Sequence, residues 1–125
     1  MKPDDYLRNT KIDIWKGTFA VVKSKKPMPN SFAAISDKNE ITCVIDQEKI
    51  REEDAIEIEG GWKILTFETV LSFELVGFLA RVSKALAEEG ISIFVISVYS
   101  TDHILMKEKD LQKAVNKLKG LGCMA

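Results

Sequence analysis

Hydrophobic residues recur with the period of an α-helix in two segments of the second half of the chain. The first segment covers residues 76–89 and ends before Gly90, a residue that is common at helix C-termini. The second starts near residue 111 and ends at the glycines that follow residue 119. The apolar positions of each segment share one helix face: Phe78, Leu79, Val82 and Leu86 in the first, Leu111, Ala114, Val115 and Leu118 in the second.

A β-hairpin is predicted between these two helices. Residues 91–100 are rich in isoleucine and valine, residues 101–102 suit a turn, and residues 103–107 suit a return strand. The run 91–100 is apolar on both faces, because large apolar side chains occupy odd and even positions alike. One face is expected to carry the two helices. The other needs a cover, which predicts contact with the first half of the chain or a homo-oligomer, with a dimer favoured.

The first half of the chain shows strand patterns and no helical period. Strands are predicted over residues 18–23, 31–36 and 40–45, and the last two form a hairpin. Pro27 and Pro29 lie between the first two strands and exclude a helix there.

Shorter signals complete this half. Residues 1–13 are mostly polar, which predicts a flexible N-terminal arm. Asp46 is a favourable N-cap for a short helix over residues 47–51. Gly60-Gly61 is expected to break the chain before a strand over residues 62–68.

A short internal repeat, or echo, links the two halves of the sequence. Residues 40–50 resemble residues 102–111, and in both places a hairpin strand leads into a charged helix start. The period is about 60 residues, which indicates a duplication. We therefore predict a first, degenerate unit over residues 14–61 and a second unit over residues 62–125. The loop with the two prolines stands where the second unit has its long helix.

Composition narrows the class of protein. The chain of 125 residues has a formal net charge of −1, so a nucleic-acid partner is not expected. Its N-terminus has no apolar signal core, and no apolar run is long enough to cross a membrane. Cys43 and Cys123 show no metal-ligand spacing, and a buried thiol is expected for Cys43. We expect a cytoplasmic protein without membrane contact, cofactor or metal.

Few residues of the sequence suggest a binding or catalytic site. Gly77 stands at a predicted helix start, where free N–H groups attract a carboxylate, but glycine is often a steric need at such a junction. Asp102 suits an ammonium group, but aspartate is also a common turn former. His103 follows Asp102, yet adjacent strand residues point to opposite faces and no nucleophile motif accompanies them. An enzyme is therefore not expected.

The segments Ser72–Ala80, Gly90–Ser97 and Ser100–Glu108, taken together, resemble the ACT-domain superfamily. The likeness is to small tandem-ACT proteins, to the ACT region of aspartate kinases and to the cytosolic arginine sensor. Weaker similarity reaches back to about Phe19. The resemblance implies an α+β, ferredoxin-like fold of two βαββαβ-type repeats that share a mainly antiparallel sheet, the first repeat lacking its first helix. It also implies allosteric binding of an amino acid.

The resemblance further implies a ligand site at the loop into the first helix and at the hairpin turn. Asp102 matches an aspartate and Tyr99 an aromatic residue of the arginine sensor, but Leu75 stands where that sensor has an acid, which counts against arginine. Glu74 suits a cationic ligand or a solvated loop. A rival hypothesis is a structural or partner-binding ACT module with a vestigial pocket. The implied ligand-binding residues are Ser72, Phe73, Glu74, Leu75, Val76, Gly77, Tyr99, Thr101 and Asp102.

Overall fold

The structure, a computed structural model, describes residue 5, residues 7–68 and residues 77–125. The chain divides into two compact units: unit 1 comprises Met1–Trp15 and Lys63–Ala125, and unit 2 comprises Lys16–Trp62. Unit 2 contains β2 (Phe19–Ser24), β3 (Ala33–Ser36), β4 (Ile41–Asp46) and the 3-10 turns η1 (Gln47–Lys49) and η2 (Glu52–Asp54). β5 (Ala55–Phe67) starts in unit 2 and ends in unit 1. Unit 1 also contains β1 (Ile12–Ile14), α2 (Phe78–Glu88), β6 (Phe94–Ser97), β7 (Asp102–Lys107), the turn η3 (Glu108–Asp110) and α3 (Leu111–Gly120).

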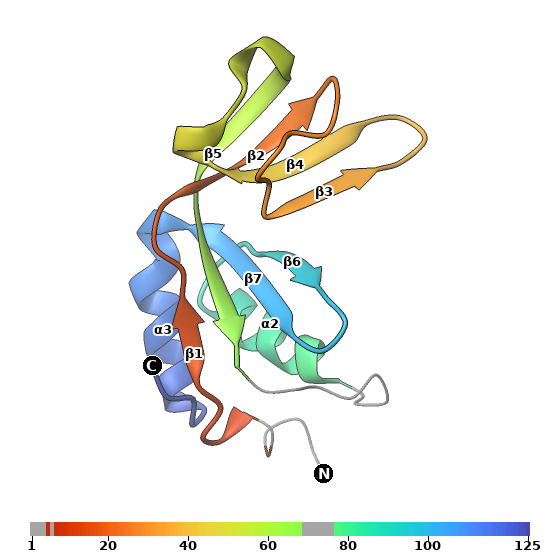
Figure 1. The fold of residues 1–125 in the computed structure, drawn as a ribbon. Coiled ribbons are helices and arrows are strands. Elements are labelled where there is room, and N and C mark those ends of the chain that lie inside the picture. The colour runs from red at the N-terminus through yellow and green to blue at the C-terminus, as the bar shows by residue number, and fades with distance from the viewer. Residues whose placement is uncertain (1–4, 6, 69–76) are drawn as a thin grey trace. The chain divides into compact units, whose positions relative to one another are not determined.

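Unit 1 is a sheet in the order β1-β5-β7-β6 with two helices (Figure 1). Alternate residues of the two central strands, such as Leu65 and Phe67 of β5 and Ile104 and Met106 of β7, join one hydrophobic core. The same core takes in the apolar stripes of α2 and α3, so both helices pack on one face of this sheet. The two predicted helices and the sheet they cover are confirmed.

The N-terminal residues that the structure describes correct the expected flexible arm. Leu7 is fully buried, and Ile12 is 3% exposed and pairs with Phe67 of β5. The Ile12 N–H donates to the Met124 carbonyl at 2.7 Å, and the Met124 N–H donates to the Thr10 carbonyl at 2.8 Å. Pairing with β5 and with the C-terminal residues orders this segment. The sequence did not predict it, because two apolar residues among polar ones form no periodic pattern. Residues 7–15 thus supply unit 1 with a strand, and the first expected unit begins at Lys16 instead of residue 14.

Unit 2 has strands in the order β3-β4-β2-β5 and no α-helix among its residues, all of which the structure describes. Its core is small: Ala20, Val22, Met28, Cys43 and Ile45. Met28 comes from the loop between the two prolines, and its N–H contacts the buried Cys43 sulfur at 3.4 Å. The loop therefore places one side chain on the sheet where unit 1 packs a helix, as the prolines predicted.

The two units repeat one strand order. In unit 1, β5, β6, β7 and β1 take the places that β2, β3, β4 and β5 take in unit 2. The predicted echo also holds in detail: β4 and β7 each have six residues, and each leads into a three-residue 3-10 turn. Asp46 caps the first of these turns by accepting the Glu48 N–H at 2.9 Å. The expected helix over residues 47–51 is only this turn.

Two strands, β5 and β6, differ most from their predicted limits. β5 continues through Gly60-Gly61, where the Gly61 N–H donates to the Gln47 side-chain oxygen at 2.6 Å and Gly61 adopts φ +82°. A glycine pair therefore bends this strand without ending it. β6 is shorter than the run 91–100, because Ile91 closes the preceding helix through its N–H bond to the Leu86 carbonyl.

Candidate functional site

Three elements meet at one end of unit 1: the end of β5, the start of α2 and the start of β7 (Figure 1). The rings of Phe67, the last residue of β5, and Phe78, the first residue of α2, are 5.3 Å apart and edge to face. β7 is the neighbour of β5, and Thr66 near the end of β5 lies 2.7 Å from the His103 side chain, so Asp102, the first residue of β7, belongs to this end of the sheet as well. Gly77 and Asp102, both predicted from the sequence, are therefore brought to the same end of unit 1.

Gly77 is the N-cap of α2 and has φ +88°, a left-handed conformation that side chains disfavour. Having no side chain, it cannot cap the N–H groups of the first helical turn. Its carbonyl accepts the Arg81 N–H at 2.9 Å, which closes that turn. A helix start offers backbone N–H donors to an anion, and glycine has no side chain to block a close approach.

The predicted turn residues lie in the β6–β7 hairpin. Ser97 pairs with Asp102, and the Val98 N–H donates to the Thr101 carbonyl at 2.9 Å. Thr101 and Asp102 are half-buried, while Tyr99 is 83% exposed at the tip. The remaining predicted ligand-binding residues, Ser72, Phe73, Glu74, Leu75 and Val76, lie outside the described residues.

Hydrogen bonds join the side chains of Trp15, Thr66 and His103 into a chain that we call the polar relay. Sequence reasoning missed it. The Trp15 Nε1–H donates to the Thr66 hydroxyl oxygen at 2.7 Å, and that oxygen is 2.7 Å from Nδ1 of His103. The Trp15 and His103 rings are also edge to face, with centroids 6.2 Å apart. Because the Thr66 oxygen accepts from Trp15, its own proton can be donated to a neutral His103. No spacing pattern predicts this relay, since its members are 51 and 37 residues apart.

Burial sets the charge state of this histidine. Desolvation lowers the pKa of His103 below its usual 6.5, and the adjacent Asp102 carboxylate opposes that shift without reversing it. The neutral ring fits the hydrogen bond from Thr66. His103 is buried, so its place in the relay favours a structural role over general acid–base chemistry with a solvent-borne substrate.

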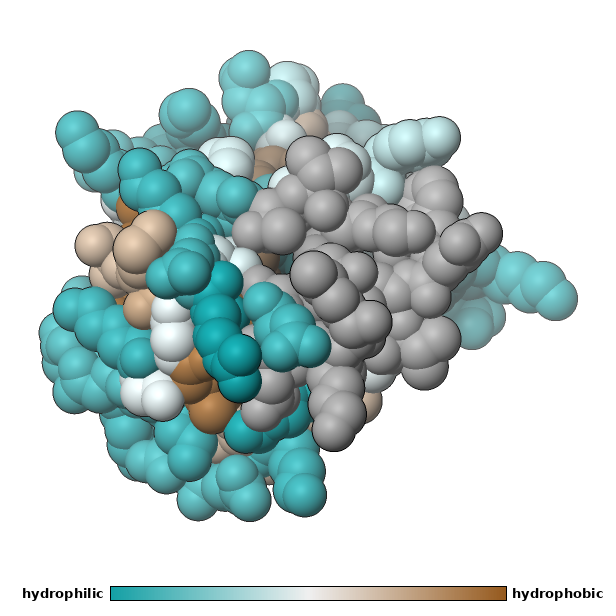
Figure 2. Space-filling model, turned by 90° about the horizontal axis from the view of Figure 1, so that it is seen from below, coloured by the Kyte–Doolittle hydropathy of each residue, from teal (hydrophilic) through white to brown (hydrophobic). Residues whose placement is uncertain are grey.

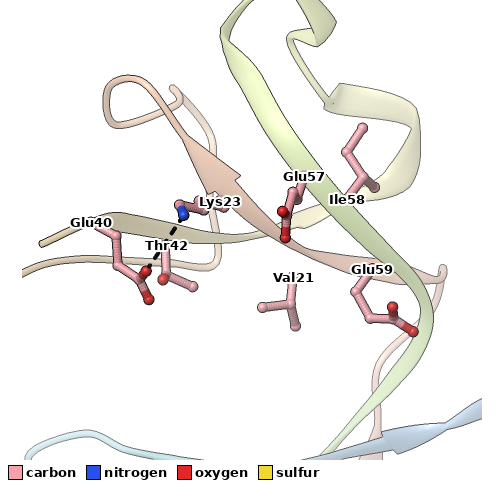
Figure 3. A pocket seen from close by; sticks show the side chains of 7 residues that line it. All are labelled: Val21, Lys23, Glu40, Thr42, Glu57, Ile58 and Glu59. Carbon is pink, nitrogen blue, oxygen red and sulfur yellow. Dashed lines mark ion pairs between the residues drawn. The ribbon is translucent and has the colours of Figure 1, made fainter.

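Unit 2 carries a depression of about 320 Å³ on one face of its sheet (Figure 3). Glu40, Glu57 and Glu59 line it together with Lys23, whose Nζ is 4.0 Å from a Glu40 carboxylate oxygen. Strand register explains the gathering, because Lys23 pairs with Glu57 and Val21 pairs with Glu59 across β2 and β5. The alternation Ile56-Glu57-Ile58-Glu59 is a strand signal, although the sequence analysis predicted this strand only from residue 62.

Neither the described part of the unit 1 site nor the depression of unit 2 has the ligand set of a metal centre. Across residues 7–68 and 77–125, no three histidine, cysteine, aspartate or glutamate side chains are grouped so as to hold a metal ion. In the same part of the chain, no helix is long and apolar enough to cross a membrane.

An antiparallel sheet with two helices on one face, in the strand order of unit 1, defines a ferredoxin-like α+β domain. The chain belongs to the ACT domain family: the model of that family matches residues 57–120, just over half of the chain. No curated protein matches in a sequence comparison.

Solved structures share the fold over nearly the whole chain. A protein from Agobacterium tumefaciens is similar with a TM-score of 0.79 and 24% identity, over 92% of this chain and 90% of its own. A protein of unknown function from Vibrio cholerae gives 0.77 and 23%, over 93% of each chain. The regulatory subunit of aspartate kinase from Thermus thermophilus, in its ligand-free form, gives 0.63 and 8%, over 90% of this chain and 97% of its own. At these identities the likeness shows the fold alone.

Proposed function

We propose that this protein is a non-catalytic regulatory ACT module that binds a small molecule, an amino acid, at the end of unit 1 formed by the starts of α2 and β7. One observation carries the proposal: Gly77 and Asp102 belong to the same end of one sheet. The first offers backbone donors and the second a carboxylate. The regulatory role of the similar aspartate kinase subunit supports the same conclusion.

An amino acid complements this pair of groups. Its carboxylate suits the N–H groups at the start of α2, where the helix dipole adds partial positive charge. Its ammonium group suits Asp102, through a charge-assisted hydrogen bond. Asp102 is half-buried, so this bond would be less screened than one on an open surface. Ser72–Val76, Tyr99 and Thr101 complete the proposed site.

A thermal-shift screen of the full chain against the twenty proteinogenic amino acids tests the proposal. A ligand at a hundred times its dissociation constant adds about 2.7 kcal/mol to the free energy of unfolding. If one amino acid binds, Asp102→Asn should weaken it at least about tenfold, because the ammonium group loses its charged partner. Asp13→Asn, an exposed carboxylate on β1, is the matched control and should leave affinity unchanged.

Two results would contradict the proposal. A flat response across the panel favours the rival hypothesis, a partner-binding module with a vestigial pocket. If an amino acid binds and Asp102→Asn binds it as tightly as the parent, the site is elsewhere, and the corresponding region of unit 2 near Glu40 is the next candidate.

We also propose that the module self-associates, most simply as a dimer, through the edge strand β6. This strand ends the sheet of unit 1, and Val95, Val98 and Tyr99 along it and its turn are exposed. The coloured part of the face in Figure 2 is mainly hydrophilic, with hydrophobic residues in small separate areas. An edge is therefore a better candidate than that face. Sedimentation equilibrium should show a dimer that Val98→Lys disrupts and Ile35→Lys, in unit 2, does not.

A further inference from the structure

The outer edge of β5 in unit 2 is a candidate docking surface. Here β5 pairs with β2, and the order β3-β4-β2-β5 makes residues 55–59 the last strand segment of this unit. Regular pairing with β2 covers Glu57–Glu59, with a register shift on either side. An edge strand offers backbone N–H and C=O groups to another extended chain.

Side chains along this edge alternate between two chemistries. Ile56 and Ile58 are 53% and 48% exposed. Glu57 and Glu59 fall on the other side of the strand, with Val21 and Lys23 (Figure 3). Exposed β-branched residues on a sheet edge invite strand addition, while charges on the same edge decide which strand can be added.

Charge favours a basic occupant. Three carboxylates, those of Glu40, Glu57 and Glu59, line the depression beside this edge, and Lys23 is the one basic residue among the lining residues. Lys23 lies 4.0 Å from Glu40, and within the described residues Glu57 forms no ion pair. The face is therefore acidic, although the whole chain is close to neutral.

The positions of the glutamates disfavour a second copy of this chain in every antiparallel pair centred on residues 57–59. In an antiparallel pair of identical strands centred on Ile58, each Glu57 faces a Glu59 of the other copy. Centring the pair on Glu57 or Glu59 places that glutamate opposite itself. Like charges directly opposite each other destabilise a strand pair, whereas opposite charges stabilise it. An extended segment with lysine or arginine at alternate positions meets this edge without repulsion.

We propose that the edge Ile56–Glu59, together with the acidic depression beside it, is a docking surface for an extended basic peptide segment of a partner protein. The segment adds a short strand to β5 and places alternate basic side chains against Glu57 and Glu59, beside the depression that Glu40 also lines. Because the regular edge spans three residues, backbone bonds set the orientation and the charges carry most of the affinity. This surface lies in unit 2 and is independent of the proposed amino-acid site.

The test uses the full chain labelled with 15N and a blocked heptapeptide, Lys-Val-Lys-Val-Lys-Val-Lys, at low ionic strength. We expect amide shifts and slowed amide exchange at Ile56–Glu59, and affinity that falls as salt is added. The double variant Glu57→Gln/Glu59→Gln should weaken binding about tenfold or more. The control Glu88→Gln/Glu108→Gln, which removes two exposed carboxylates from unit 1, should change it less than about twofold.

Two further probes and two further outcomes can overturn the proposal. A heptapeptide of the same sequence that is N-methylated at alternate residues keeps its charge but loses N–H donors, so equal binding would exclude strand addition. Spermine that shifts the same amides as strongly would make the surface a simple cation site. A dimer that pairs through Ile56–Glu59 without peptide, or peptide-induced shifts confined to unit 1, would also contradict it. A native-like amide spectrum of each variant is required before its affinity is compared.

Discussion

The two units use one strand order to support different amounts of hydrophobic core. Unit 1 packs two amphipathic helices on its sheet and has fourteen buried core residues among those that the structure describes. The core of unit 2 has five, and its cover is a proline-containing loop with two 3-10 turns. The half with the larger core also has the helix start and the buried polar relay. The half with the smaller core has exposed strand edges and acidic side chains. The unit with helices carries the proposed small-molecule site, and the unit without them carries the proposed docking surface.

The comparison also shows how the units are connected. β5 serves as the last strand of unit 2 and the first of unit 1, and β1 fills the last strand position of unit 1 from the N-terminal side. The second repeat is therefore completed by residues that precede the first repeat in the sequence. Four tests, taken from the largest expected effect to the smallest, can break or sharpen this comparison.

The largest effect is expected from the strand that completes unit 1. Ile12→Ala removes a core side chain that is 3% exposed and should lower the free energy of unfolding by about 2–5 kcal/mol. Ile14 lies on the same strand but is 38% exposed, so Ile14→Ala should cost less than about 1 kcal/mol. Urea unfolding followed by circular dichroism measures both. Equal, small losses would mean that β1 does not complete the core of unit 1.

A smaller effect is expected from the polar relay of unit 1. Thr66→Val keeps the side-chain shape but removes the hydroxyl that contacts Trp15 and His103, which should cost about 1–3 kcal/mol. The equivalent of His103 on β4 of unit 2 is Thr42, which is half-buried and lines the open depression. Thr42→Val is therefore the control and should be within about 0.5 kcal/mol of the parent. If Thr42→Val lowers the free energy of unfolding as much as Thr66→Val does, the two hydroxyls are equally important.

The relay also predicts a pH dependence that unit 2 lacks, because His103 is the only histidine of the chain. Its pKa is lowered in the folded state, so as pH falls below 6.5 the unfolded chain takes up a proton that the folded chain resists. Stability should decrease through this range, by at most about 1.4 kcal/mol per pH unit, and level off below the folded pKa. Unfolding at pH 5.5–8 compares the parent with His103→Gln, in which the slope should be smaller. An unchanged slope would assign the dependence to other groups.

Local sequence signals predicted the helices, the absence of a helix from unit 2 and the duplication. The helical stripe around Val82 and Leu86 placed α2, and Pro27 and Pro29 excluded a helix from unit 2. Repetition of a strand followed by a charged turn revealed the duplication. In each case the residues that carry the information lie within a few positions of the element that they specify.

Long-range pairing accounts for what sequence reasoning missed. Leu7 and Ile12 become core residues only through contact with β5 and the C-terminal residues, and a short polar segment gives no sign of such contacts. Thr66 and His103 lie on two different strands and Trp15 follows a third, so their relay has no spacing to find. The positions of Gly77 at a helix start and of Asp102 at the turn before a strand were predictable, because both have local signals, while their role in ligand binding stays a prediction. The role of Ser72–Val76 stays a prediction.

The smallest effect is expected at two glycines that flank the helices of unit 1. Gly90 follows α2 with φ +72° and has open space around it, so Gly90→Ala should cost about 1 kcal/mol through backbone strain alone. Gly120 ends α3 with open space and without a positive φ, so Gly120→Ala should be neutral or stabilise by up to about 1 kcal/mol, because alanine favours the helical conformation. Thermal unfolding of both variants under one set of conditions measures the difference in sign. If both substitutions destabilise equally, the termini of the two helices are constrained by something other than backbone conformation, and the helical half is then less tolerant of change than its open glycines indicate.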